Sequence, residues 1–215
     1  ARMHHPNFAP SQAALIAQIY SRQVASDVEL SLMAVYPDEY PVVMIHAAGT
    51  AGQVVERIPL YQVDRSRSIG LLTALYLPPL PADTAFEDFQ EVVARLRAPD
   101  GCPWDREQTH ESLRKYLLEE TYEALDALDA GDLEGMREEF GDLLLQIVLH
   151  AQIGVEDGEF SMTDILQGIN QKIRRRHPHV FGEVQVSGSD GVLQNWEKIK
   201  EEERKSSGEV EKGLL

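Results

Sequence analysis

The chain has 215 residues, 43% hydrophobic and 26% charged, which is ordinary for a globular protein of one or two domains. Its formal net charge of −16 excludes broad binding to nucleic-acid backbone, so phosphate groups must bind at a local basic site or through a metal ion. The single cysteine, Cys102, excludes an internal disulfide framework and indicates a reducing cytoplasm. We see no signal peptide and no apolar run near the about 20 residues that span a membrane.

The first 80 residues predict a region that mixes a helix with strands. SQAALIAQIYSRQ at 11–23 has helical periodicity. Segments rich in β-branched and aromatic residues predict strands at 28–36, 41–49 and 53–63. The proline-rich stretch LPPLPADT at 77–84 predicts a connector and a domain boundary.

From Phe86 onward the pattern is helical. Apolar periodicity predicts helices at 86–98, 109–128, 133–156, 161–176 and 195–205. Thr109 is the predicted N-cap of the second helix, with Ser112 marking an alternative start, and His177-Pro178 ends the fourth. Residues 206–215 contain too few apolar residues to order themselves, which predicts a flexible tail.

A narrow polar stripe runs along the 133–156 helix. Its members recur at spacings of 3, 4 and 4 and are Glu139, Asp142, Gln146 and His150. At about 100° per residue the stripe is only about 40° wide, and leucines border it on both sides. A broad apolar face comprises Phe140, Leu143, Leu144, Ile147, Val148 and Ala151. The pattern predicts a helix buried nearly all round, with one polar seam pointing into a bundle.

The 109–128 helix carries carboxylates that can meet this seam. Its predicted core face comprises Leu117, Thr121, Ala124, Leu125 and Leu128, with Glu120 at the edge and Glu123 one turn later. Glu119 is more nearly opposite the core. The AGD turn at 130–132 makes the two helices antiparallel neighbours, so Glu120 and Glu123 can approach Glu139 and Asp142.

Four converging carboxylates repel one another unless protons or a divalent cation neutralise them. Oxygen ligands without cysteine favour Mg²⁺ or Mn²⁺, and Mg²⁺ in turn suggests phosphoanhydride chemistry. The alternative interpretation is a solvated helix surface, because most E-x-x-E pairs face water. The narrowness of the seam favours the metal interpretation.

A basic cluster contrasts with the acidic chain and comprises Lys172, Arg174, Arg175, Arg176, His177 and His179. Cations at a helix C-terminus offset the macrodipole, and they also bind phosphate, so both interpretations are open. Lys172, Arg175 and Arg176 share a helix face and are the predicted phosphate ligands.

Several further residues have two open interpretations. Trp196 is either a core residue or a platform for a nucleobase, and Lys200, one turn later, can reach phosphate. Cys102 and Trp104 predict a structural turn, with Trp104 as a core residue. Gln108 and His110 are weaker candidates for substrate contacts, and His150 is expected to support the ligands rather than to be one.

Five blocks in this order resemble the MazG family of nucleoside triphosphate pyrophosphohydrolases. They are GCPWDREQTHESL (101–113), LLEETYE (117–123), EEFGDLLLQIVLHA (138–151), KIRRRHPHVFGE (172–183) and NWEKIK (195–200). The resemblance covers about residues 86–205. It implies an all-α domain that uses Mg²⁺ to split nucleoside triphosphates between the α and β phosphates, generally as a homodimer.

The resemblance also implies roles for particular residues. The metal-binding acids carry over to Glu120, Glu123, Glu139 and Asp142. Glu119 is an outer ligand or the base for the attacking water. The resemblance supports Lys172, Arg175, Arg176 and Lys200 as phosphate contacts and Trp196 as a nucleobase contact.

Residues of about 8–80 are similar to the C-terminal end of tetrapyrrole (corrin/porphyrin) methylases. The glycine-rich cofactor-binding half of that family is absent, so methyltransferase activity is not expected. The region is either a structural remnant or part of a longer fusion protein, and the start at Ala1 fits an excised piece.

The combined prediction is a mainly α protein: a MazG-like helical bundle at 81–205, preceded by a small α+β methylase-like region at 1–80 and followed by the tail at 206–215. It hydrolyses nucleoside triphosphates to NMP and pyrophosphate in nucleotide-pool housekeeping, with Mg²⁺ or Mn²⁺, as a cytoplasmic homodimer that binds no nucleic acid or membrane. The alternatives are a narrower substrate, dUTP or a phosphoribosyl nucleotide, or a catalytically silent helical interaction module.

Overall fold

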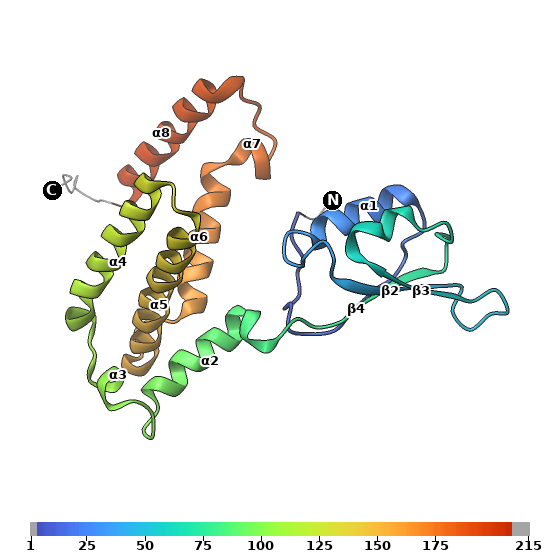
Figure 1. Ribbon diagram of the computed structural model, residues 1–215. Coiled ribbons are helices and arrows are strands. Elements are labelled where there is room, and N and C mark those ends of the chain that lie inside the picture. Colours follow the sequence, from blue (N-terminus) through green and yellow to red (C-terminus); the bar gives the residue numbers. More distant parts are fainter. Residues whose placement is uncertain (1–3, 208–215) are drawn as a thin grey trace. The chain divides into compact units, whose positions relative to one another are not determined.

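A computed structural model describes residues 4–207 of the chain (Figure 1). The chain forms two compact units, Ala1–Gly101 and Cys102–Leu215. This division falls after the helix predicted at 86–98, whereas the proline-rich connector predicts a boundary at 80/81. The extent of the functional domain therefore stays a prediction. The predicted tail lies outside the described residues from 208 onward.

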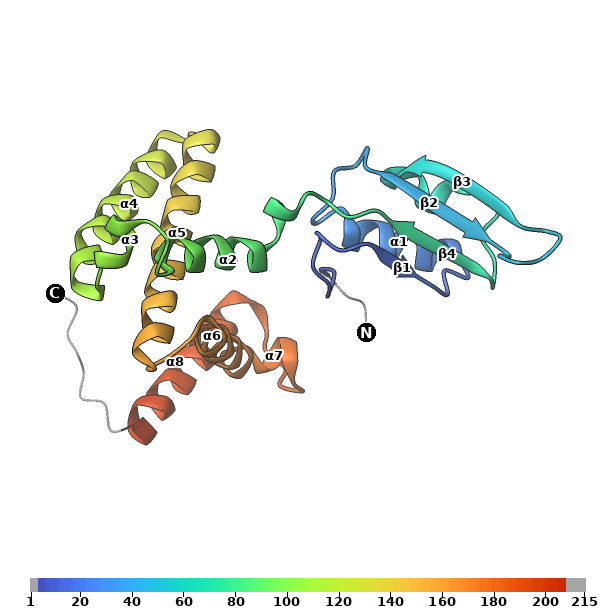
Figure 2. The ribbon, with the colours of Figure 1, turned by 90° about the horizontal axis from the view of Figure 1, so that it is seen from below.

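Unit 1 contains a four-stranded antiparallel sheet in the order β1-β4-β2-β3. The strands are β1 (Ala14–Ile16), β2 (Pro41–His46), β3 (Val54–Pro59) and β4 (Thr73–Leu77). Alternate residues of β2 and β4, among them Met44 and Leu75, are buried against α1 (Arg22–Leu32) and the 3-10 helix η1 (Leu60–Arg65). Figures 1 and 2 both show α1 along one face of the sheet. The unit also contains η2 (Ala82–Thr84) and α2 (Phe86–Arg97).

Two predictions for unit 1 are wrong, because helix and strand are exchanged. Residues 14–16, predicted as helix, form β1, which pairs with β4 from Ala14↔Leu77 to Ile16↔Leu75. The first part of the strand predicted at 28–36 belongs to α1, which Ser21 caps by accepting a hydrogen bond from the Val24 amide at 3.3 Å. Pairing with a distant strand is a tertiary effect that local periodicity does not contain.

Unit 2 is helical, as predicted. Its elements are α3 (Pro103–Glu107), α4 (His110–Ala130), α5 (Leu133–Asp157), α6 (Met162–Arg176), α7 (Pro178–Phe181) and α8 (Gly188–Ser207). The predicted boundaries hold to within a few residues except for α8, which begins before the predicted Asn195. Among residues 4–207, no helix has both the length and the apolar character needed to cross a membrane.

The turn between α4 and α5 is short and fully capped. Gly131, in the left-handed region at φ 66°, donates its amide to the carbonyls of Ala127 and Leu128. Asp132 then caps α5 by accepting from the amides of Glu134 and Gly135, both at 3.1 Å. Because two residues connect the helices, α4 and α5 lie side by side and antiparallel (Figure 2).

The start of α4 is fixed by a capping box. Ser112 donates its amide to the Thr109 hydroxyl at 3.1 Å, and the Thr109 amide donates to the Ser112 hydroxyl at 2.9 Å. Thr109 is thus the N-cap, as predicted, and Ser112 is its partner rather than an alternative start.

Candidate active site

The polar seam of α5 faces α4, as predicted. On α4 the buried and half-buried positions recur at helical spacing as Leu113, Leu117, Glu120 and Ala124. On α5 they include Glu139, Asp142, Gln146 and Leu149, and Gln146 is only 6% exposed. Carboxylate and amide side chains therefore lie between the two helices. Leucines occupy neighbouring positions of the same faces.

Three carboxylates of this seam form a compact group. Glu120 and Glu123 of α4 and Glu139 of α5 each offer an oxygen, and these oxygens lie within 4.8 Å of one another. Asp142, predicted as the fourth ligand, is outside this group, but its charge acts on both Glu120 and Glu139. Glu119 is exposed and also outside the group.

The group is electrostatically unfavourable without a counter-charge. Partial burial, followed by the charges of Asp142, Glu123 and Glu139, raises the pKa of Glu120 above its ordinary value. Partial burial and the charges of Glu123 and Asp142 likewise raise the pKa of Glu139. Both carboxyls are therefore ionised less readily than an isolated glutamate.

Buried polar atoms along the seam lack partners. Within residues 4–207, Glu139 Oε2, Gln146 Oε1 and His110 Nε2 are buried and accept or donate no hydrogen bond. A buried, unpartnered carboxylate oxygen is costly unless a cation or water satisfies it. The donor set consists of oxygens from acidic side chains, which suits a hard divalent ion such as Mg²⁺. The residues present therefore fit a cation of this class.

Two histidines meet at the other end of the seam. His110, the first residue of α4, and His150 of α5 approach with their Nδ1 atoms 2.7 Å apart and their rings nearly parallel. Burial, then the neighbouring His110, lowers the pKa of His150. The imidazole of His110 stacks with the rings of both His150 and Phe160, and its contact with substrate stays a prediction.

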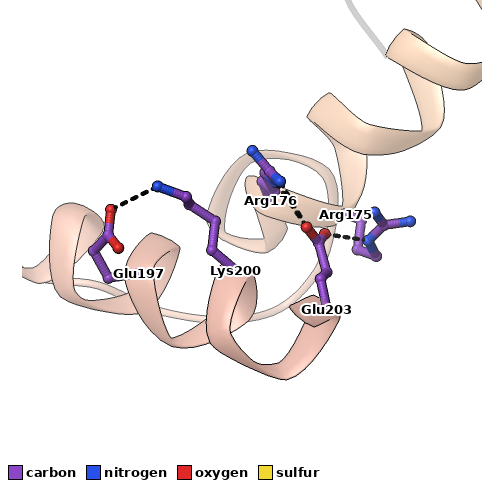
Figure 3. Close-up of polar contacts among 5 residues, drawn as sticks. All are labelled: Arg175, Arg176, Glu197, Lys200 and Glu203. Atoms are coloured by element: carbon purple, nitrogen blue, oxygen red, sulfur yellow. Dashed lines mark hydrogen bonds and ion pairs between the residues drawn. The ribbon is translucent and has the colours of Figure 1, made fainter. Parts of the chain in front are cut away.

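The basic residues gather on a different helix pair, α6 and α8. Arg175 and Arg176, at the end of α6, both donate to Glu203 of α8 (Figure 3). The Arg176 guanidinium carbon lies 5.7 Å from the Trp196 ring centroid, and Lys200 Nζ lies 4.5 Å from it. Four of the five predicted substrate contacts are thus neighbours, whereas Lys172 is exposed earlier on α6.

Glu203 is a member of this group that the sequence prediction missed. It follows Trp196 and Lys200 at spacings of 7 and 3, so all three share one face of α8. That spacing is the one sequence signal that could have identified Glu203. Its arginine partners lie on the other side of a loop, and helical periodicity cannot predict contacts across a loop.

Gln108 and Trp104 both have partners near the α3–α4 corner. Gln108 donates to the Trp104 carbonyl at 2.9 Å and accepts from the Ser112 hydroxyl at 2.8 Å, and its contact with substrate stays a prediction. Trp104 is 50% exposed and contacts the Tyr116 ring edge-on, so it is not a core residue. Cys102 is a half-buried free thiol at the N-cap of α3. The sequence predicts a structural role for it and not a catalytic one.

The prediction that α5 is buried nearly all round is wrong for the single chain. Phe140 and Ile147 are 50% and 43% exposed, and on α4 the predicted core residues Leu125 and Leu128 are also about half exposed. A pair of helices covers only the faces that they turn to each other, so the outer apolar stripes remain accessible.

Part of the chain is similar to known nucleotide pyrophosphohydrolases. The sequence profile of the MazG nucleotide pyrophosphohydrolase domain matches residues 108–181. A Bacillus subtilis protein, YabN, whose description is "uncharacterized", is 45% identical over 197 residues, which cover 90% of this chain and 40% of YabN. The match to YabN therefore includes most of unit 1 as well as unit 2.

Two relatives have descriptive names. The nucleoside triphosphate pyrophosphohydrolase/pyrophosphatase MazG of Thermotoga maritima is 48% identical over 124 residues, 57% of this chain and 47% of the relative. The nucleoside triphosphate pyrophosphohydrolase of Escherichia coli K12 is 50% identical over 114 residues, 53% of this chain and 43% of the relative. The chain thus spans less than half the length of these relatives. The seam carboxylates, Arg175 and Arg176 all lie within residues 108–181, the segment that is similar to the MazG nucleotide pyrophosphohydrolase domain.

Proposed function

We propose that this protein hydrolyses nucleoside triphosphates between the α and β phosphates, giving a nucleoside monophosphate and pyrophosphate. The observation that carries the proposal is the group of Glu120, Glu123 and Glu139, whose oxygens lie within 4.8 Å of one another. The activity for which the T. maritima and E. coli relatives are named supports the same reaction.

In this proposal Glu120, Glu123, Glu139 and Asp142 hold Mg²⁺, with Mn²⁺ as a substitute. The raised pKa values of Glu120 and Glu139 support a cationic ligand, because a divalent charge removes the repulsion that raises them. Bound Mg²⁺ offsets phosphate charge and makes water a better nucleophile.

The other residues bind and orient the substrate. Glu119 lies beside Glu120 in the chain but outside the three-carboxylate group, which favours a role as general base over a role as ligand. It takes the proton of the water whose oxygen bonds to the α-phosphorus, while the bond from that phosphorus to the bridging oxygen breaks and pyrophosphate leaves.

The phosphate chain is bound by Lys172, Arg175, Arg176 and Lys200, and the nucleobase stacks on Trp196. The proximity of Arg176 and Lys200 to the Trp196 ring supports one binding region for base and phosphates. Opposite charges on the α4–α5 and α6–α8 helix pairs suit a substrate that carries both a metal ion and bare phosphate oxygens.

A homodimer is proposed to cover the outer stripes of α4 and α5. Leu118, Tyr122, Leu125, Phe140 and Ile147 are each 43–61% exposed, and a patch of this kind on a helix pair marks an interface. Light scattering after gel filtration measures the mass in solution, and a monomer at micromolar concentration would contradict this part.

Product analysis tests the reaction. The protein is incubated with each NTP and dNTP, dUTP included, in the presence of Mg²⁺, and the products are separated by ion exchange. NMP plus pyrophosphate is expected, whereas NDP plus phosphate would refute the bond assignment. Competition among the substrates distinguishes a housekeeping enzyme from one with narrow preference. The absence of turnover together with unchanged thermal stability would favour a silent interaction module.

Two further assignments stay proposals. A reducing cytoplasm is the proposed compartment, supported by the unpaired Cys102. A methylase-like origin of residues 1–80 rests on sequence resemblance alone.

A further inference from the structure

Glu203 of α8 reaches back to the end of α6 and contacts two arginines at once. One carboxylate oxygen accepts from Arg175 Nε at 2.6 Å, and the other accepts from Arg176 Nε at 3.1 Å and Nη2 at 2.7 Å (Figure 3). The Nε and Nη2 groups of Arg176 thus converge on one oxygen of Glu203, while Arg175 occupies the other oxygen, so a single carboxylate engages both arginines.

This contact differs from the other ion pairs of α8. The side chains of Arg176 and Glu203 are each only 21% exposed, whereas those of Lys205 and Glu201 are 72% and 64% exposed. Hydrogen bonds from Arg176 and then Arg175 lower the pKa of Glu203 to about 2. Glu203 is therefore ionised at every pH at which the protein is expected to work, and solvent screens the pair less than a surface pair.

The contact also orients the face of α8 that carries the predicted nucleobase platform. Trp196, Lys200 and Glu203 lie at helical spacing on one face, and Arg176 and Lys200 both approach the Trp196 ring. Joining Glu203 to α6 therefore fixes the position of Trp196 and Lys200 relative to the arginines.

We propose that Glu203 is a positioning residue that holds Arg175, Arg176 and the Trp196–Lys200 face of α8 in the arrangement that binds the phosphate chain. The inference rests on the proposed function for the identity of the ligand, a di- or triphosphate. Glu203 accepts hydrogen bonds from Nε and Nη2 of Arg176, and the Nη1 end of the guanidinium is proposed to donate to phosphate oxygens. It acts through the arginines and does not touch the reacting atoms.

A competing arrangement makes the opposite prediction. If Glu203 occupies the place of a substrate phosphate and must be expelled, removing its charge strengthens substrate binding. If it only holds two helices together, removing its charge changes thermal stability without changing substrate affinity.

The test compares Glu203→Gln with the wild type and with Glu201→Gln, a control on the exposed ion pair with Lys205. Steady-state kinetics with an NTP and Mg²⁺ should give a KM about tenfold higher for Glu203→Gln and a kcat within about twofold of wild type, with no change for Glu201→Gln. Glu203→Asp keeps the charge on a shorter side chain and should restore part of the affinity. A KM that is unchanged or lower in Glu203→Gln would overturn the proposal.

A second measurement separates this inference from the proposed reaction. Calorimetric binding of inorganic tripolyphosphate requires no turnover, and Glu203→Gln should bind it about tenfold more weakly than the wild type. A wild type that binds tripolyphosphate but hydrolyses no NTP refutes the reaction and leaves Glu203 to be judged by this ratio. Equal affinities, or no binding by the wild type, overturn the inference. If circular dichroism shows that Glu203→Gln loses helix, the ratio for Glu203→Asp decides, and wild-type affinity in that variant overturns the proposal.

Discussion

The α4–α5 helix pair brings like charges together, whereas the α6–α8 helix pair brings opposite charges together. Between α4 and α5, like charges are brought together, so the pKa values of Glu120 and Glu139 rise and a carboxylate oxygen stays without a partner. Between α6 and α8, Glu203 neutralises part of the arginine charge, and its pKa falls to about 2. The first arrangement is incomplete by itself, whereas the second is already organised.

The difference indicates what each region requires from outside. An incomplete group gains stability when a cation arrives, so its occupancy should be visible in the folding equilibrium. An organised group gains little stability from a ligand, but it has already oriented its side chains and so lowers the cost of binding. The following predictions test this contrast, from the largest expected effect to the smallest.

Glu120→Gln should have the largest effect, because it removes a charge from the centre of the three-carboxylate group. A fall in kcat/KM on the order of 10² to 10³ is expected, as for the loss of one electrostatic contact to a transition state. Asp126→Asn, on the exposed side of the same helix, is the matched control and should retain activity. Near-normal turnover by Glu120→Gln would remove the metal assignment.

Arg176→Lys tests the organised pair. Lysine keeps the charge but cannot donate to Glu203 from two fixed nitrogens as Arg176 Nε and Nη2 do, so KM should rise about tenfold with kcat little changed. Arg174→Lys is the control, because Arg174 lies over the Phe181 ring at 5.1 Å instead. A large fall in kcat with an unchanged KM would contradict the assignment of Arg176 to substrate binding.

Mg²⁺ should stabilise the fold in a pH-dependent way. Because the pKa values of Glu120 and Glu139 are raised above 4.5, the folded metal-free protein holds those protons more tightly than the unfolded chain. The stability that those protons contribute is complete below about pH 4.5 and is lost as pH rises through the folded pKa values.

Mg²⁺ replaces the lost protons, so the rise in Tm on adding it should be larger at pH 8 than at pH 5. At a hundredfold excess over Kd the stabilisation is about 2.7 kcal/mol. Differential scanning calorimetry with Mg²⁺ or EDTA measures it. The same increment at both pH values, or in a Glu120→Gln/Glu139→Gln protein, would show that the ion acts elsewhere.

The histidine pair provides the smallest expected effect. The pKa of His150 is lowered from 6.5 in the folded protein. As pH falls, His150 therefore takes up its proton in the unfolded chain at a higher pH than in the folded protein. The folded state loses stability as pH falls from 6.5 through the folded pKa. The difference in Tm between wild type and His150→Gln should therefore shrink from pH 7.5 to pH 5.5. A constant difference would mean that the proton equilibrium of His150 is not coupled to folding.

The helices of unit 2 could be predicted from sequence because their signals are local. Capping residues such as Thr109, turn residues such as Gly131 and long apolar periodicities lie within the segments that they define. In unit 1 the local pattern predicts helix where β1 lies, because β1 is defined by its pairing with the distant strand β4. Apolar alternation and helical periodicity are hard to distinguish over a strand of three residues.

The candidate site shows the same division between local and tertiary information. Helical spacing and one short turn predict that Glu120, Glu123, Glu139 and Asp142 approach one another, and the first three of them form the compact group. They were not enough to find Glu203, because the path from Arg176 to Glu203 passes through α7 and a loop whose course has no periodicity. The exposure of Phe140 was also missed, since a wheel shows which residues share a face but not what covers that face.

The two-residue link between α4 and α5 has a consequence for evolution and engineering. Each residue of an α-helix advances the side chain by about 100° around the axis. One residue inserted between Gly131 and Asp132 would have to be absorbed by the loop, or else α5 would rotate and carry Glu139 away from Glu120 and Glu123. The length of this link therefore sets the rotation of α5 about its own axis relative to α4. We expect indels there to abolish ion binding even where every acidic side chain is retained.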